Sequence, residues 1–189
     1  MNNGKNIKTN LKNYNKQGYS PGRNKLIRLF WFIINALIFQ NPLLYLPRIK
    51  ILLLRLFGAK VGLGVIIKCS VNIKYPWKLS IGDYVWIGEK VWLDSLAQIS
   101  IGNNVCISQG AMLLTGNHDY KKSSFDLIVK GIVLKDGVWI AAKAVVCPGV
   151  TAESHAILTV GAVATKDLQS FCIYQGNPAV KMRKRAIEQ

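Results

Sequence analysis

The sequence predicts an all-β solenoid, and three observations support that prediction. Hydrophobic residues make up 50% of the 189 positions, so the chain can bury one substantial core. From Val61 to Ala164, aliphatic residues return at intervals of six, with one long interruption. Units of about six residues are too short for helical repeats, but each fits one flat side of a triangular coil. We therefore expect residues 61–170 to form stacked coils of parallel strands.

The repeat carries two columns of side chains. The second column lies four residues after the first and is mostly small or β-branched, as at Val85, Val91 and Ala144, which suits the corners of a coil. Two extra residues follow every third unit in the early part, so Ile81 and Ile101 are twenty residues apart. The spacing leaves the handedness of the coil open. The first column, expected to point into the core, is Val61, Ile67, Ile73, Leu79, Ile81, Ile87, Leu93, Ile99, Ile101, Ile107, Leu113, Leu134, Ile140, Val146, Ala152, Leu158 and Ala164.

Residues 1–60 lack the repeat and are expected to form a basic tail followed by short apolar helices. The run LIRLFWFIINALIF suits a helix, and the dipeptides Asn41-Pro42 and Leu46-Pro47 break the helical pattern. In RIKILLLRLFG, four apolar residues share one helix face and a glycine provides a natural stop: Ile49, Leu52, Leu53, Leu56 and then Gly58. At the other end, residues 171–189 are expected to form a short basic helix or tail.

The charge of the chain is strongly positive and unevenly distributed. The net charge is +16, and fourteen basic residues precede Asp83, the first acidic residue. Such a segment attracts polyanions, for example an anionic membrane face or phosphates, or it simply keeps the protein soluble. No nucleic-acid-binding module accompanies the charge, so a nucleic acid partner is not expected.

The apolar run from Leu29 to Phe39 is too short to span a bilayer. It can lie on an anionic membrane surface, cap the open end of the solenoid or pack against a neighbouring subunit, and all three remain open. The first 25 residues contain no apolar segment suited to a cleaved signal peptide. We therefore expect a cytoplasmic location, with peripheral contact at the inner face of the cell membrane as one option. The four cysteines are widely spaced, which favours reduced thiols.

The interruption LLTGNHDYKKSSFDLIVKGIVL contains His118, one of two histidines in the chain. An excursion over about residues 117–132 from one corner of a rigid scaffold is the usual form of a binding loop. An imidazole there can act as a general base, bind a metal or form part of a turn. The other histidine is His155, and two histidines do not readily supply a three-histidine metal site, so no metal is expected.

General-base chemistry suits this histidine best. A neutral imidazole can remove a proton from a hydroxyl that attacks an activated carbonyl. The sequence has no GxSxG motif and no evident Ser-His-Asp arrangement, so we expect direct transfer without a covalent acyl-enzyme.

Four segments resemble one known superfamily: the hexads, GNHDY, IAAKAVVCPGVT with VGAVATKDL, and the ending GNPAVKMRKR. They are similar to the left-handed β-helix acyltransferases, the hexapeptide-repeat proteins that use acetyl-CoA. RLFGAKVG, YPWKLSIGDYVWIGE and the ISQ before the histidine segment look like the branch assigned to colanic acid or capsular polysaccharide biosynthesis. The similarity begins near residue 21. It implies a left-handed coil, although parallel crossovers are otherwise right-handed, and a homotrimer with active sites between adjacent solenoids.

The resemblance also assigns roles on the acceptor side of the site. His118 matches the catalytic histidine, which would deprotonate a sugar hydroxyl as it attacks the thioester of acetyl-CoA. Asn117 and Asp119 flank it and would orient the imidazole, contact the acceptor or only form the turn. Asp94 and Trp92 on the early coils are further candidates to face the sugar, although a tryptophan there can equally serve trimer packing. The asparagine common on the acceptor side of related enzymes is replaced here by Gly88.

On the coenzyme side, Ala142 and Val160 match positions whose backbone lines the pantetheine groove in acetyltransferases of the galactoside type. Thr165, Lys166 and Arg183 match positions near the nucleotide, where Lys and Arg can pair with phosphates. Lys166 can equally be an exposed turn residue and Arg183 part of a basic tail. The implied function is an acetyl-CoA-dependent O-acetyltransferase that acts on a sugar in surface polysaccharide biosynthesis. N-acetylation of an amino sugar and a non-catalytic, membrane-associated scaffold of polysaccharide assembly are the alternatives.

Overall fold

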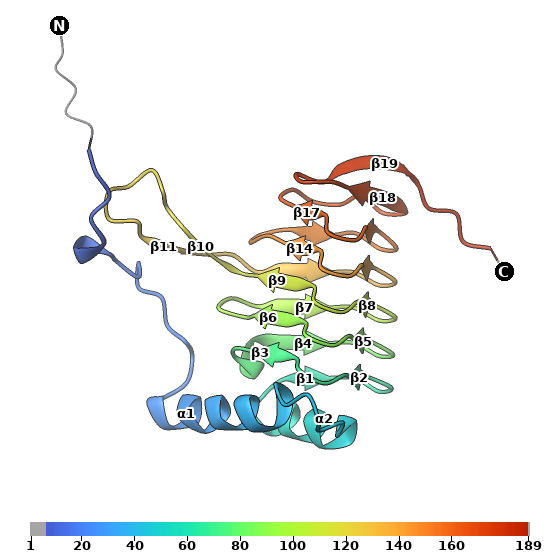
Figure 1. Ribbon diagram of the computed structural model, residues 1–189, viewed down its shortest axis with the longest axis horizontal. Helices are drawn as coiled ribbons and strands as arrows, with labels where there is room; N and C mark the ends of the chain where they lie inside the picture. Colours follow the sequence, from blue (N-terminus) through green and yellow to red (C-terminus); the bar gives the residue numbers. More distant parts are fainter. Residues whose placement is uncertain (1–6, 189) are drawn as a thin grey trace, which may run out of the picture.

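Three sheets, parallel except for the last strand of the second, form the sides of a triangular solenoid in the computed structural model, which describes residues 7–188 (Figure 1). The first sheet contains β1 (Lys60–Val61), β4 (Leu79–Ile81), β7 (Ile99–Ile101), β12 (Ile132–Leu134) and β15 (Thr151–Ala152). The second contains β2 (Ile66–Ile67), β5 (Trp86–Ile87), β8 (Cys106–Ile107), β13 (Trp139–Ile140), β16 (Ile157–Leu158), β18 (Cys172–Gln175) and β19 (Val180–Lys184). The third contains β3 (Asn72–Ile73), β6 (Trp92–Asp94), β9 (Met112–Leu114), β14 (Val145–Val146) and β17 (Val163–Ala164).

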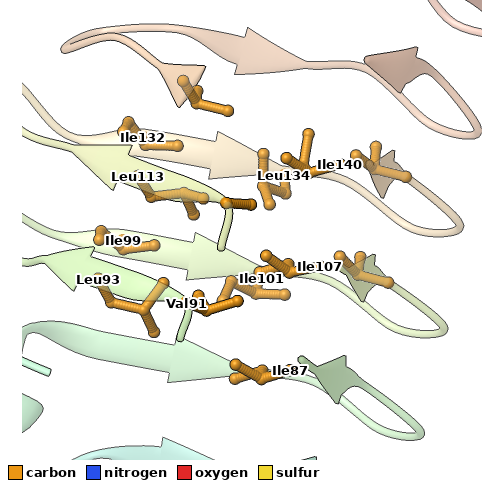
Figure 2. Close-up of a cluster of buried hydrophobic side chains, with 14 of the residues drawn as sticks. Ile87, Val91, Leu93, Ile99, Ile101, Ile107, Leu113, Ile132, Leu134 and Ile140 are labelled. Carbon is orange, nitrogen blue, oxygen red and sulfur yellow. The ribbon is translucent and has the colours of Figure 1, made fainter. Parts of the chain in front are cut away.

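The core is the first column of the repeat, stacked coil upon coil. In the first sheet, Val61, Ile81, Ile101, Leu134 and Ala152 are partners in successive strand pairs. Every member of the column except Val61 is buried, and Val61 on the first strand is partly buried. Figure 2 shows the equivalent isoleucines and leucines of neighbouring coils lying above one another. The strand pairing and the burial confirm the predicted solenoid and its inward column. Burial of each Leu or Ile side chain stabilises the fold by about 1.5–3 kcal/mol.

A ladder of side chains joins the turns that follow the first four strands of the first sheet. The Asp83 carboxylate accepts a hydrogen bond from the Leu63 amide at 2.7 Å, and the side-chain oxygen of Asn103 accepts one from the Asp83 amide at 2.9 Å. The Asp136 carboxylate accepts the next, from the Asn103 amide at 2.7 Å. A Cβ on Gly82 would lie 2.6 Å from the Asn103 side-chain oxygen, so the ladder leaves no room for a side chain there. This explains the recurring Gly-Asp and Gly-Asn pairs.

Two helices close the open end of the first coil. α1 (Lys25–Ile34) begins at Asn24, whose side chain accepts from the Ile27 amide, and continues as the π-helical segment η2 (Asn35–Phe39). α2 (Pro47–Leu56) follows the Pro-containing break. Figure 1 shows both helices lying across one end of the stack. No helix among residues 7–188 is long and apolar enough to cross a membrane.

These helices satisfy backbone groups of the first coil, which has no coil beneath it. The Trp31 indole donates to the Ile73 carbonyl at 2.8 Å, and the Asn35 side-chain oxygen accepts from the Ile73 amide at 3.1 Å. The buried Lys50 ammonium donates to the Lys68 carbonyl at 2.7 Å, and burial lowers the Lys50 pKa. Polar groups at an unpaired sheet edge are costly when buried, so these contacts make the helices a cap.

The opposite end differs from the short basic helix or tail expected there. β19 folds back antiparallel on β18, with Cys172 paired to Lys184 and Gln175 to Val180. The Arg185 guanidinium then donates to the Gly137 and His155 carbonyls at 3.0 and 3.2 Å. Pairing with β18 satisfies the backbone groups of this segment and covers the edge of the second sheet. All four cysteines are free thiols, and burial raises the pKa of Cys147.

Candidate active site

The interruption of the repeat is a β-hairpin that leaves the corner between β9 and β12 (Figure 1). Its strands are β10 (Gly116–His118) and β11 (Leu127–Val129), paired so that His118 lies opposite Leu127. The Lys130 amide donates to the Thr115 carbonyl at 2.9 Å and closes its base. The sequence predicted an excursion here but did not reveal its two strands. The hairpin places His118 where β10 ends.

The surroundings of His118 fix both its ring orientation and its proton. The Nδ1 atom is 3.0 Å from the Phe125 carbonyl oxygen, which can only accept a hydrogen bond. In the neutral imidazole, Nδ1 therefore carries the proton and Nε2 carries the lone pair. The ring stacks on Phe125 with centroids 4.5 Å apart and an interplanar angle of 8°. The Tyr14 ring, 5.8 Å away, tilts against it. A half-buried imidazole held in this way has the form of a general base.

The neighbours Asn117 and Asp119 shape the turn around the histidine. The exposed Asn117 side chain accepts from the His118 amide at 2.8 Å, and the Asp119 carboxylate accepts from the Lys121 amide at 3.2 Å. Within the described chain, neither side chain hydrogen-bonds to the imidazole. Of the roles considered for them, turn formation is the one that these contacts support.

An N-terminal segment, residues 7–22 and here called the arm, crosses the hairpin. The Leu127 amide donates to the Asn15 carbonyl at 3.0 Å. Asp126 is 4% exposed, and its carboxylate accepts from the Asn15 amide at 3.2 Å and from the Gln17 side chain at 2.8 Å. Hydrogen bonds from Ser124 and then from Lys122 and Gln17 lower the Asp126 pKa, against the opposing effect of burial. The sequence suggested a simple tail here, so the arm is a part of the site that sequence reasoning missed.

A cavity of about 300 Å³ opens beside the imidazole, between the arm, α1, the third sheet and the hairpin. We call it the His118 cavity; its lining is Tyr14, Lys16, Tyr19, Pro21, Arg28, Lys74, Tyr75, Leu96, His118 and Leu127. The lining combines aromatic rings with three cationic side chains. A larger hollow of about 460 Å³ under α1 shares Arg28, Lys74 and Tyr75 with it, so the two adjoin.

The arm is anchored at the edge of this cavity by Lys78. Its ammonium donates to the Tyr19 hydroxyl at 3.4 Å and the Ser20 carbonyl at 3.1 Å, and lies 4.6 Å from the Tyr19 ring centroid. Burial, together with Tyr75 and Asp94 nearby, raises the Tyr19 pKa, and burial lowers the Lys78 pKa. Tyr19 is therefore a neutral phenol and a hydrogen-bond donor at physiological pH.

Asp94 and Trp92 lie next to this cavity. The Asp94 carboxylate is 8% exposed and forms an ion pair with Lys74, whose ammonium lies 3.2 Å from Oδ1. Lys74 lines both hollows, so Asp94 acts on the cavity through it. Trp92 is 38% exposed and lines the larger hollow under α1. The structure thus brings both predicted acceptor-side residues close to the His118 cavity.

Comparison with known proteins defines the family, although no protein-family model matches the chain. The chain is 40% identical over 169 residues to the protein provisionally named colanic acid biosynthesis acetyltransferase WcaF of Escherichia coli K12, covering 89% of this chain and 92% of that protein. This chain belongs to the family of that acetyltransferase. The enzyme is accordingly an acyltransferase, and solved hexapeptide-repeat acetyltransferases share the left-handed β-helical fold that the sequence resemblance implied.

Solved structures share the fold of this acetyltransferase. The hexapeptide-repeat acetyltransferase VCA0836 of Vibrio cholerae superposes with a TM-score of 0.77 at 23% identity, covering 86% of this chain and 92% of that protein. The same Vibrio protein in complex with acetyl coenzyme A gives a TM-score of 0.76 at 22% identity, with 86% and 88% covered.

The coenzyme-side candidates of the acetyltransferase lie on two edges of the prism. Ala142 and Val160 occupy the corner between the second and third sheets, where the Gly161 amide donates to the Ala142 carbonyl at 2.9 Å. Thr165 and Lys166 are exposed at the corner that follows β17, two coils beyond the corner that carries His118. Arg183 lies on β19, opposite Ile173. Within one chain, Ala142 therefore lies close to Val160, and Thr165 lies next to Lys166. The first pair and the second pair are on different edges of the prism.

The part of the acetyltransferase that the structure describes contains no group of side chains placed to bind a metal ion. Among residues 7–188, no three His, Cys, Asp or Glu side chains gather closely enough to hold a metal ion. The second histidine, His155, lies in the turn between β15 and β16, where its ring stacks on Phe171 with centroids 4.6 Å apart, away from the hairpin.

Proposed function

We propose that this enzyme transfers an acetyl group from acetyl-CoA to a hydroxyl of a sugar in surface polysaccharide biosynthesis. The observation that carries the proposal is the free Nε2 lone pair of His118, fixed by the bond between Nδ1 and the Phe125 carbonyl. The naming of the Escherichia coli relative for colanic acid biosynthesis supports the substrate class. The reaction is assigned to the cytoplasm, where acetyl-CoA is available.

The proposed reaction is a direct transfer. Nε2 of His118 takes the proton of the acceptor hydroxyl as its oxygen attacks the thioester carbonyl carbon. The tetrahedral intermediate collapses, the C–S bond breaks, and the imidazolium returns the proton to the departing thiolate. The products are an acetyl ester and free CoA. A general base of this kind contributes a rate factor of roughly 10² to 10⁴.

The acceptor is assigned to the His118 cavity. Tyr14, Tyr19 and Tyr75 offer ring faces and hydroxyls that suit a sugar ring. Lys16, Arg28 and Lys74 add cationic donors, of which Lys74 is held by Asp94. This lining favours an acceptor that carries a negative charge, such as a phosphate or an acidic sugar.

The coenzyme is assigned to a groove between two copies of the chain in a homotrimer. The separation of Ala142 and Val160 from Thr165 and Lys166 supports a shared site, because two solenoids packed side by side can bring different edges together. The corner of Thr165 and Lys166 lies above the hairpin corner, at about 5 Å per coil. Thr165, Lys166 and Arg183 would contact the phosphates of the coenzyme. Ala142 and Val160 would line the path of its pantetheine arm. The proposed reaction requires no metal.

The enzyme offers a matched pair of histidines for the test. With acetyl-CoA and a sugar acceptor, His118→Ala should lower the rate of CoA thiol release by roughly 10² to 10⁴, whereas His155→Ala should leave it nearly unchanged. Calorimetry should show that both variants bind CoA as the wild type does. A fully active His118→Ala variant would refute the mechanism, and a wild type without saturable CoA binding would favour the scaffold alternative.

The choice between O- and N-acetylation needs a separate experiment. Matched hydroxyl and amino forms of one sugar should be offered together, and the acetyl group located by mass spectrometry. We expect an ester from the hydroxyl form. An amide formed in preference would reassign the enzyme to N-acetylation with the same base.

A further inference from the structure

α1 is apolar around almost its whole circumference. Its inner side packs on the first coil through Trp31, and η2 continues this side with Asn35 and Phe39. A helix that faced water would carry polar side chains on the opposite side. Here the outward row is Leu26, Leu29, Ile33 and Leu37, exposed by 64%, 55%, 43% and 63%, and it is flanked by the exposed Phe30 and Phe32.

The apolar surface continues over the linker and α2. Leu43, Leu44 and Tyr45 are exposed in the linker, and Leu43 is 88% exposed. On α2, Ile49, Leu52 and Leu56 of the apolar stripe turn outward, whereas Lys50 and Leu54 turn inward and Leu53 is half-buried against the core. Figure 1 places both helices at one end of the stack. We call this surface the base face: Leu26, Leu29, Phe30, Phe32, Ile33, Leu37, Leu43, Leu44, Tyr45, Ile49, Leu52 and Leu56. So many exposed apolar side chains on neighbouring helices at one end of a molecule indicate a contact with a partner.

The charges around the base face are of one sign. Lys25 lies at the start of α1, and Arg48 and Arg55 lie on α2, all exposed. The first acidic residue of the whole chain is Asp83, so neither helix and no part of the linker carries a carboxylate side chain. The partner should therefore combine an apolar layer with negative charge.

We propose that the base face docks on an anionic lipid bilayer. The leucines and phenylalanines would enter the boundary between headgroups and acyl chains, with Lys25 and Arg48 at the lipid phosphates, whereas the Arg55 guanidinium donates to the Val61 and Gly62 carbonyls. A second copy packed base to base fits less well, because it would bring two cationic surfaces together without a carboxylate from either helix. The helices are too short to cross the bilayer, so the contact is peripheral. This inference does not depend on the reaction at His118.

Flotation of the full-length protein with vesicles tests the proposal. The base variant replaces Leu29, Ile33 and Leu37 with Ser, and a matched control replaces Val180, Met182 and Ile187, which are 56%, 57% and 55% exposed near the other end. Wild type and control should float with vesicles of phosphatidylcholine and phosphatidylglycerol in equal parts, but not with phosphatidylcholine alone. The base variant should bind at least about tenfold more weakly.

Three results would overturn the proposal: no flotation of the wild type, undiminished flotation of the base variant, or equal flotation with neutral and anionic vesicles. A larger wild-type assembly without lipid that the base variant breaks down would instead make the base a protein interface. Should the triple variant fold poorly, Leu37→Trp provides a second probe. Its added fluorescence should shift to the blue and be quenched by brominated lipid, and an unshifted emission would count against docking.

Discussion

The same corner of the solenoid carries four residues in one coil and seventeen in the next. Residues 95–98 join β6 to β7, whereas residues 115–131 join β9 to β12. The strands on both sides nevertheless keep their register, with Leu93 paired to Leu113 and Ile101 to Leu134. The register therefore depends on the inward column and the strand pairing, and it is insensitive to the length of this corner.

The two corners also differ in what their side chains contact. In the short corner, the buried Ser95 hydroxyl donates to the Tyr75 carbonyl and accepts from the Tyr75 amide, both at 2.9 Å. The Ser95 side chain therefore joins one coil of the solenoid to the next. In the long corner, His118 and Asp126 face the hairpin and the arm. We expect stability to depend on the coils and chemistry on the hairpin, and four changes can break or sharpen this division.

Removing residues 117–129 should have the largest effect on chemistry. The deletion leaves Thr115, Gly116, Lys130 and Gly131 between β9 and β12, the same number of residues as in the short corner. We expect a folded solenoid that still binds CoA but has no measurable transferase activity. Circular dichroism would measure folding, calorimetry the binding of CoA, and thiol release the transferase activity. A deletion variant that fails to fold would show that the coils need the hairpin after all.

Ile107→Ala should have the opposite effect. Ile107 is fully buried on β8, and its truncation should lower the free energy of unfolding by about 2–5 kcal/mol. Activity per folded molecule should stay within about twofold of the wild type, because β8 contributes no residue to the lining of the His118 cavity. Urea denaturation gives the first quantity and thiol release the second. The partly buried Val61→Ala is the comparison within the same column, with a smaller expected loss.

Lys50→Ala tests the cap at the base. The substitution leaves the Lys68 carbonyl without its donor and opens space beside Phe39, so we expect a loss of about 1–3 kcal/mol in unfolding free energy. The neighbouring, exposed Arg48→Ala should change stability by less than about 0.5 kcal/mol. Equal effects of the two substitutions would mean that the buried ammonium contributes nothing specific to the cap.

Asp126→Asn should have the smallest effect, because it loosens the arm without touching the imidazole. We expect the KM for the acceptor to rise roughly threefold to tenfold with kcat nearly unchanged. Asp119→Asn is the matched change on the same hairpin and should leave the arm in place.

The same carboxylate makes the arm contact dependent on pH. The Asp126 pKa is lowered in the folded protein, so its contribution is complete above the ordinary carboxyl pKa and is lost as the pH falls through the lowered value. Hydrogen exchange of the Leu127 amide, which donates to Asn15, reports on the contact directly. Protection should persist to about pH 4 and fall below it, whereas in Asp126→Asn it should be low throughout. Protection that does not change in acid would remove Asp126 from this role.

The coils could be predicted from the sequence because each coil buries an aliphatic residue at the same position of its repeat. Residues such as Ile107 and Ile140 recur at this spacing, and the place where the spacing is interrupted contains His118. The base face was harder to predict, because α1 and α2 are apolar on more than one side. The stripe with Ile49 and Leu52 points outward, and the inward position of Lys50 depends on the Lys68 carbonyl, which no periodicity reveals.

The arm could not be predicted for a different reason. Its contacts join single polar residues, such as Gln17 and Asp126, across 109 residues of sequence. Asn, Gln and Lys in such a segment look like a solvated tail, and only the folded hairpin provides their partners. The acceptor side of the candidate site therefore remained partly hidden, although its histidine was evident.

The long reach of the arm also sets an order in folding. Each early strand of the first sheet pairs with one twenty residues before it, as Ile101 does with Ile81, so the coils can assemble in sequence as the chain emerges. The hydrogen bond between the Asn15 amide and the Asp126 carboxylate can form only after 111 further residues have been added to the chain. The wall of the His118 cavity is consequently completed long after the first coils exist. A nascent chain can thus hold folded coils well before the His118 cavity is complete.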